Sequence, residues 1–109
     1  YEEEIDMKTE KKEIYFTVTG IFQFADIEFI KEGMELFLEK EPDNDFDNEA
    51  IMVKMKGLGK IGYVANSVKT VAGDEAYSAG RLYDKIEDTA TATVAYNMGN
   101  VIQGAIKID

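Results

Sequence analysis

Apolar and polar residues alternate in short runs along most of the chain. In the first run, Ile14, Phe16 and Val18 alternate with more polar neighbours. Further runs of β type follow at residues 34–39, 51–55, 60–64, 91–96 and 101–108. A period of two residues is typical of a strand with one buried face, because successive side chains of a strand point to opposite sides. The pattern therefore predicts a chain built mainly of short strands.

Glycine and polar residues separate these runs. Gly20 is expected to bend the first strand before an apolar continuation over residues 21–24, since a glycine inside a strand often marks a bulge. The segment from Gly57 to Gly59 predicts a tight connection, and Met98 with Gly99 is expected to form the central pair of a hairpin turn. Helical segments are expected at residues 26–31, 66–72 and 73–80, and one further strand at residues 81–87.

These elements predict an all-β fold with minor α content. About six or seven short strands with one or two helical segments favour a small, partly open β-barrel whose gap the helices cover. The length of 109 residues fits one domain. Residues 1–13 are mostly charged and are expected to form a weakly ordered lead-in, with the barrel domain over residues 14–109.

The composition excludes several kinds of chemistry. The chain contains neither Cys nor His, which removes thiol and imidazole nucleophiles, the Ser-His-Asp triad, and zinc, haem and iron–sulfur sites of the usual kinds. We therefore expect a non-enzymatic domain with no catalytic residue, no metal and no cofactor. No apolar run approaches the ~18 residues of a membrane span, so we expect no membrane association and a cytoplasmic location. Because the chain begins with Tyr1 rather than Met, the sequence leaves open whether a signal peptide was removed.

The net charge of −10 is distributed unevenly along the sequence. Residues 1–49 contain 16 acidic and 5 basic residues, whereas residues 50–109 contain 6 acidic and 7 basic residues. Residues 50–73 contain no acid and four lysines. The distribution predicts an acidic body with one acid-free face, so nucleic-acid binding is confined to that face rather than excluded.

The most acidic segment, residues 39–49, has an acid at every second position. Its three aspartates match the opening of an EF-hand loop. The match ends there, because Asn48 stands in place of the turn glycine and Lys54 in place of the bidentate glutamate. We favour a solvated loop whose Asp and Asn side chains cap turns, with a looser divalent-cation site as the minor alternative. Hydrolytic chemistry would need acids that converge from different elements, which a single loop does not provide.

Two aromatic residues near this segment have alternative interpretations. Phe46 interrupts the acidic run, and it either packs back on the core, which we favour from the sequence, or is presented to a ligand. Tyr63 follows Gly62 at the end of a strand, where it either packs at the barrel rim or serves as a stacking platform.

The lysines of the acid-free stretch are candidate phosphate contacts. Lys54 and Lys56 are two residues apart and are expected to share one face of a strand. Lys60 follows the glycine connection, and Lys69 lies near an expected helix start with free backbone amides. These lysines either hold one or two phosphates or serve only as solubilising charges.

A resemblance to the HIRAN domain family rests on the run Glu41-Pro-Asp-Asn-Asp-Phe-Asp-Asn-Glu-Ala-Ile-Met-Val53 and on Ile61-Gly-Tyr-Val64 after it. Upstream, the segments Val18-Thr-Gly20 and Gly33-Met-Glu-Leu-Phe-Leu38 resemble the first strands of the family. The resemblance covers residues 14–108 and is most specific in the central run. It implies an OB-like or SH3-like, partly open barrel of about six strands with one or two short helices.

The resemblance also implies a function. HIRAN domains occur as stand-alone bacterial proteins and in helicases of the SWI/SNF class, where the domain caps the 3′ end of single-stranded DNA at stalled forks. There the aromatic residue of the run stacks on the terminal base, and the next Asp accepts a hydrogen bond from the 3′-hydroxyl. These roles correspond to Phe46 and Asp47 here, with Asn44 shaping the loop. DNA-binding members also carry a basic residue and an aromatic residue where this chain has Phe16 and Thr17.

We therefore expect a nucleic-acid-binding module that recognises a 3′-hydroxyl end of single-stranded DNA in DNA repair or fork processing. Its affinity is expected to be low and salt-dependent, because the acidic loop repels a polyanion. The candidate contact residues are Asn44, Phe46, Asp47, Lys54, Lys56, Lys60, Tyr63 and Lys69. The expected partners are the DNA end and a helicase or nuclease, and the sequence specifies no oligomeric state. The alternative is a protein-interaction or assembly module that pairs through exposed strand edges and Met-rich or aromatic patches.

Overall fold

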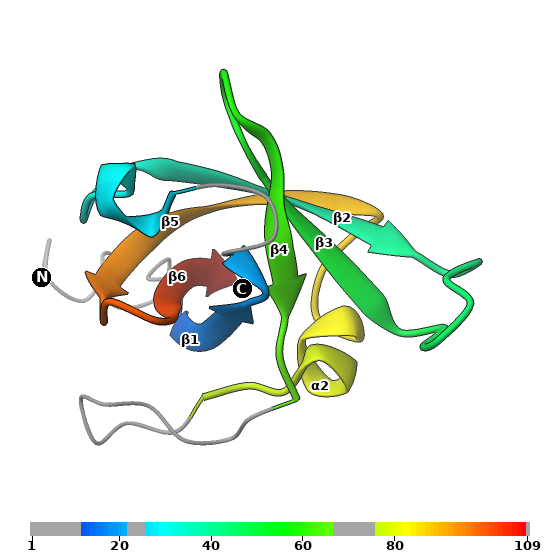
Figure 1. The fold of residues 1–109 in the computed structure, drawn as a ribbon. Coiled ribbons are helices and arrows are strands. Elements are labelled where there is room, and N and C mark those ends of the chain that lie inside the picture. The colour runs from blue at the N-terminus through cyan, green and yellow to red at the C-terminus, as the bar shows by residue number, and fades with distance from the viewer. Residues whose placement is uncertain (1–11, 22–25, 67–75, 109) are drawn as a thin grey trace, which may run out of the picture.

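The computed structural model describes residues 12–21, 26–66 and 76–108. Six antiparallel strands form one closed barrel in the order β1, β4, β3, β2, β5 and β6 (Figure 1). The strands are β1 (Lys12–Thr19), β2 (Glu35–Glu41), β3 (Ala50–Met55), β4 (Gly59–Val64), β5 (Thr89–Asn97) and β6 (Ile102–Ile108). A 3-10 turn, η2 (Ile27–Phe29), and a short helix, α2 (Ala79–Tyr83), complete the described elements. The all-β class with minor α content is thus confirmed.

The barrel is closed, and the expectation of a partly open barrel is wrong. β1 pairs along its length with β6, and its end also pairs with β4, where Val18 lies opposite Val64. Beyond this short seam, Ala76 forms a bridge to Tyr15, so the segment that leads into α2 continues along β1 where β4 diverges. Closure depends on pairings between strands that are distant in sequence, which the local alternation of side chains does not encode.

The core fills the interior of the barrel with the apolar residues of each strand. Its largest fully buried side chains include Phe16, Leu36, Leu38, Ile51, Ile61 and Ile102. Phe16 faces Gly104 across the β1–β6 ladder, and any side chain at position 104 would collide with the Phe16 ring. The first strand therefore contributes Phe16 to the core and not to the surface.

Residues 81–87 form no strand, contrary to the expectation from the sequence. The helix α2 begins after Ser78, whose hydroxyl caps the helix by accepting a hydrogen bond from the Arg81 amide. Ala79 and Leu82 are the buried residues of α2, and their spacing of three places them on one face of the helix. Of the described part of the helix expected between Gly73 and Gly80, only Ala79 and Gly80 are helical, and α2 extends beyond them to Tyr83. The short apolar pattern of residues 81–87 fits either a strand or a helix. The packing of Leu82 in the core selects the helix.

The hairpin between β5 and β6 differs from its expected form by one residue. The amide of Met98 donates to the carbonyl of Val101, so Gly99 and Asn100 are the central pair. Gly99 has a φ of 88°, which suits the first central position of a type II′ turn. The Asn97 side chain accepts a hydrogen bond from the Gly99 amide at 2.9 Å and thereby supports the turn.

The remaining expectations for the chain have mixed outcomes. The helical turn expected at residues 26–31 is present as η2, and the tight connection at Gly57–Gly59 joins β3 to β4. β1 begins at Lys12, inside the expected lead-in. The rest of that lead-in, residues 22–24 of the expected strand continuation and residues 67–72 of the expected helix lie outside the described residues.

Candidate nucleic-acid interface

The loop between β2 and β3 is held in shape by its own side chains. The Asn44 Oδ1 accepts hydrogen bonds from the amides of Phe46 at 2.9 Å and Asp47 at 3.1 Å. The Asn44 Nδ2 donates to the Glu41 Oε1 at 3.0 Å. The Asp47 Oδ1 accepts from the Glu49 amide at 2.9 Å. Short polar side chains that bond nearby amides stabilise turns, so this acidic loop is an ordered structure, as expected from its Asp and Asn content.

Phe46 projects from this loop into solvent. Its side chain is 97% exposed, whereas the amide of the same residue is bonded to Asn44. The expectation that Phe46 packs on the core is therefore wrong. Burial of a phenylalanine side chain contributes about 1.5–3 kcal/mol, and this free energy is not gained in the isolated domain. An aromatic ring held in solvent by an ordered backbone is available to a ligand.

A pocket of about 390 Å³ lies beside Phe46, with the loop on one side and β4 on the other. It is lined by Asn44, Phe46, Asp47, Ala50, Lys60, Tyr63 and Val64. The size lies within the range of small-ligand sites, about 300–1,000 Å³. A carboxylate has about four lone-pair sites, so the Asp47 side chain retains acceptor capacity beside its bond to Glu49. The pocket thus combines an aromatic face, a carboxylate acceptor and an ammonium group.

A chain of hydrogen bonds joins the loop to β4. The Lys60 Nζ donates to the Tyr63 hydroxyl at 2.7 Å, and this hydroxyl donates to the Glu41 Oε1 at 2.8 Å. The Lys60 ammonium also lies 4.4 Å from the centre of the Tyr63 ring, a cation–π distance. Because Glu41 also accepts from Asn44, the position of the lysine is linked to the shape of the loop. Glu41 was not among the site residues expected from the sequence, since one more acid in an acidic run carries no distinct signal.

A β-bulge explains why Lys60 and Tyr63 meet. They are three residues apart, and a regular strand would place them on opposite faces. The register between β3 and β4 shifts, however: Val53 lies opposite Gly62, but Lys54 lies opposite Lys60. The extra residue in β4 reverses the alternation at this point. Both side chains therefore lie on the outer face, where they line the pocket together.

The other candidate residues are divided between the pocket and its surroundings. Lys54 is paired with Glu39, with its Nζ 2.9 Å from the Glu39 Oε1. Lys54 and Lys56 line a neighbouring groove, in keeping with the expectation that they share a face. Lys69 lies outside the described residues. Lys60 is therefore the candidate lysine that the structure places in the pocket itself.

The second half of β1 differs from the DNA-binding pattern described above. Phe16 is fully buried and Thr17 is 6% exposed. Neither residue carries a charge, and neither presents an aromatic face to solvent. These two positions therefore supply no charged contact to a phosphate.

Metal binding by the acidic segment finds no support in its geometry. Within residues 12–21, 26–66 and 76–108, no group of three or more carboxylates is placed to hold a metal ion. The whole acidic segment 39–49 belongs to this part of the chain. Among the same residues, no helix has the length and apolar character needed to cross a membrane.

The ionisation of Glu41 depends on its neighbours. Burial raises the pKa of Glu41, but hydrogen bonds from Asn44 and Tyr63, followed by the charges of Lys60 and Lys54, together lower it below the ordinary value of 4.5. A carboxylate whose pKa is lower in the folded state stabilises the fold above its unfolded pKa. This contribution is lost as the pH falls through the folded pKa.

We expect the variant Glu41→Gln to be less stable than the unmodified domain at pH 7. The difference should shrink as the pH falls below about 4.5, because protonated Glu41 no longer differs in charge from glutamine. Urea unfolding between pH 7 and pH 3 measures both free energies. The variant Glu28→Gln, on η2, controls for the loss of a negative charge. A difference that stays constant across this pH range would contradict the assignment.

Comparisons with known proteins agree with this fold. The HIRAN domain family model matches residues 11–108. Among solved structures, the HIRAN domain of human HLTF is similar with a TM-score of 0.63 and 14% identity, covering 88% of this chain and 74% of that chain. A protein from Lactobacillus plantarum is similar with a TM-score of 0.59 and 19% identity, covering 91% of this chain and 98% of that chain. No curated protein matches the chain significantly. Because the family model spans nearly all of the sequence, the chain belongs to the HIRAN domain family.

Proposed function

We propose that this domain is a nucleic-acid-binding module, without catalysis of its own, that recognises the 3′-hydroxyl end of single-stranded DNA during repair or fork processing. Membership of the HIRAN family supports the binding of nucleic acid. The observation that carries the proposal is the exposed ring of Phe46, which stands beside Asp47 at a pocket and is held there by an ordered loop. A helicase or nuclease that acts on the same DNA end is the partner we expect.

Four residues of the pocket have a role in this proposal. Phe46 stacks on the terminal base, and such stacking tolerates any base because every base has an aromatic face. Asp47 accepts a hydrogen bond from the 3′-hydroxyl, and its charge repels a 3′-phosphate. Lys60 contacts a backbone phosphate from the opposite wall. Asn44 keeps the loop in its binding shape through its bonds to two amides.

In this proposal, Lys60 of β4 provides the phosphate contact that a basic residue of the first strand provides in DNA-binding members of the family. Phe16 and Thr17 are uncharged and buried at the positions where DNA-binding members of the family carry a basic and an aromatic residue. The Lys60 ammonium lies on the Tyr63 ring and hydroxyl, in the wall of the same pocket. A cation placed in this way supplies the phosphate contact from β4.

The closed barrel disfavours the alternative of an assembly module that pairs through strand edges. Each of the six described strands has a neighbour on both sides, although β1 and β4 pair only over a short seam. Pairing by strand addition requires an unpaired edge. Among the exposed large apolar side chains of the described residues, Phe46 is the most exposed, and it lies at a pocket.

A fluorescence titration with matched oligonucleotides tests the proposal. We expect a 3′-hydroxyl strand to bind at low salt and the same strand with a 3′-phosphate to bind more weakly. The variant Asp47→Asn keeps an oxygen for the Glu49 amide but removes the charge, so it should reduce this preference. For a single strand, the slope of log affinity against log salt should be about −0.7 per phosphate contact. Equal binding of both strands, or binding of neither, would refute recognition of the 3′ end.

A further inference from the structure

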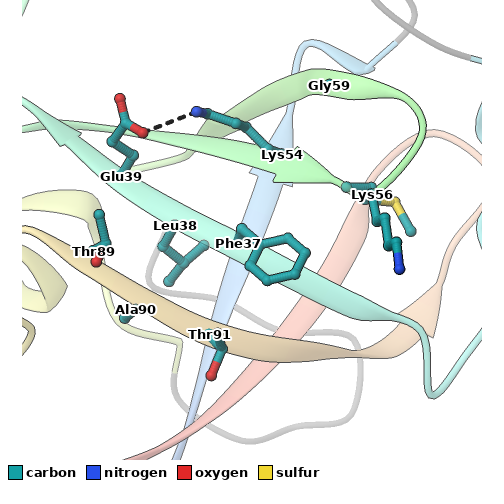
Figure 2. Close-up of a pocket in the computed structure, with 10 residues that line it drawn as sticks. Phe37, Leu38, Glu39, Lys54, Lys56, Gly59, Thr89, Ala90 and Thr91 are labelled. Atoms are coloured by element: carbon teal, nitrogen blue, oxygen red, sulfur yellow. Dashed lines mark ion pairs between the residues drawn. The ribbon is translucent and has the colours of Figure 1, made fainter.

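A second hollow, of about 660 Å³, lies on the outer face of the barrel across β5, β2 and β3 (Figure 2). Its walls include Phe37, Glu39, Lys54, Lys56, Thr89 and Thr91. We call it the Phe37 groove, because the Phe37 ring lies in its middle, with the Glu39–Lys54 pair to one side and Lys56 to the other (Figure 2). Phe37 was not among the candidate contact residues expected from the sequence.

The strand register connects this groove with the pocket at Phe46. Phe37 of β2 lies opposite Thr91 of β5 and also opposite Lys54 of β3. Lys54 in turn lies opposite Lys60 of β4. Directly opposite residues point to the same face of a sheet, and neighbouring strands lie about 4.8 Å apart. The four residues therefore form one row, about 14 Å long, across the outer face.

Lys60 belongs both to this row and to the wall of the Phe46 pocket. Its backbone pairs with Lys54 in the row, whereas its ammonium reaches Tyr63 in the wall of the Phe46 pocket. Two aromatic rings, Phe46 and Phe37, are thus separated by two lysines. Sites for single-stranded nucleic acid combine these features, a cationic track for the backbone and aromatic faces on which bases stack.

The charges of the groove are accessible to a phosphate. The side chains of Lys54 and Glu39 are 41% and 44% exposed, respectively. An exposed ion pair of this kind contributes little to stability, so a phosphate can replace the Glu39 carboxylate at small cost. Lys56 is exposed at the end of β3, where it extends the track beyond Phe37.

We propose that the Phe37 groove is a second nucleotide subsite. A single strand whose 3′ end is held at Phe46 continues over Lys60 and Lys54, and an upstream base stacks on Phe37. The inference rests on the proposed function and extends it from a terminal nucleotide to a strand of several nucleotides. Binding sites of about 4–16 nucleotides on small barrels of OB type provide a scale for the expected length.

The test compares 3′-hydroxyl thymidine oligonucleotides of two, four and eight residues. For the unmodified domain, affinity should rise with length. The variant Phe37→Ala should weaken the eight-residue strand about tenfold and leave the two-residue strand unchanged, because one stacked base is lost. Phe29→Ala removes another exposed phenylalanine, 69% exposed on η2, and should change neither affinity. Since Phe37→Ala leaves all charges in place, it separates stacking from general attraction to a longer polyanion.

A second variant guards against an effect of misfolding. Glu39→Gln removes the carboxylate that pairs with Lys54 and should tighten the eight-residue strand severalfold, a gain that a damaged fold cannot produce. Glu28→Gln removes the same charge at η2 and should have a smaller effect, because exposed charges beyond about 10 Å are screened at 0.1 M salt.

The outcomes separate this inference from the proposed function. If eight residues bind no more tightly than two, or if Phe37→Ala weakens both lengths equally, the groove is not a subsite, although end recognition stands. A different result would separate them the other way: affinity rises with length and falls in Phe37→Ala, but 3′-hydroxyl and 3′-phosphate strands bind with equal affinity. The groove is then a nucleotide subsite, and recognition of the 3′ end is refuted. If no strand binds at low salt, both are overturned.

Discussion

Replacing Phe46 with alanine is expected to weaken binding of a 3′-hydroxyl oligonucleotide by about tenfold to a hundredfold. Stacking of one base on an aromatic side chain contributes about 1–3 kcal/mol, which corresponds to this range of affinity. The stability of the domain should not change, because the side chain is 97% exposed and packs on no core residue. Fluorescence anisotropy measures the affinity, and thermal unfolding measures the stability of the same preparation.

Two variants control this result. Phe46→Tyr keeps an aromatic face and should keep most of the affinity. Phe29→Ala removes a phenylalanine of comparable exposure away from the pocket and should have no effect. An unchanged affinity in Phe46→Ala, or an equal loss in Phe29→Ala, would show that the exposed ring is not the stacking platform.

The substitution Gly62→Ala is expected to destabilise the barrel by about 3 kcal/mol, a large effect for one methyl group. A Cβ atom at position 62 would collide with the carbonyl oxygen of Thr19 and approach the Val18 Cγ1 to 3.2 Å. Both of these residues belong to β1 at its short seam with β4. A backbone oxygen cannot rotate away as a side chain can, so the two strands must separate. Urea unfolding measures the loss, and hydrogen exchange should show faster exchange at the Ala65 amide, which donates to the Thr17 carbonyl across this seam.

The matched control is Gly80→Ala in α2. A Cβ atom there would lie 3.1 Å from the Glu49 Oε1, which is the far end of a flexible side chain. Alanine is also preferred to glycine inside a helix by about 1 kcal/mol. This variant should therefore be neutral or slightly stabilising. If Gly62→Ala stays within about 0.5 kcal/mol of the unmodified domain, the seam tolerates a side chain and the close approach is not limiting.

Much of the local structure was predictable from the sequence. The two-residue alternation located the six strands, because burial of one face acts on each strand separately. The loop at residues 42–49 was also predictable as a set of turns, since Asn44 and Asp47 bond amides only two or three positions away. The same local motif supported the family assignment, which the match over residues 11–108 confirms. Structure that depends on interactions between residues close in sequence can therefore be predicted from the local sequence pattern.

The short helix and the hairpin turn were harder to predict. Residues 81–87 had an apolar pattern that fits two kinds of element, and the packing of Leu82 in the core selected the helix. At the β5–β6 turn, the pairing of Met98 with Val101 shifted the central pair by one residue. In both cases the local sequence is compatible with two conformations of similar free energy, and contacts with the rest of the barrel select one of them.

The sequence by itself determined the strand class, the turn-forming loop and an acid-free stretch of lysines. Only the tertiary structure decided that the barrel closes, that Phe46 stands in solvent and that Lys60 lies on Tyr63. The physical reason is the range of the interactions involved. Closure and the β4 bulge arise from pairing between strands, and the exposure of Phe46 follows from a loop that Glu41 ties to β4. Such long-range contacts bring residues of unrelated sequence position into one site, and no local pattern records them.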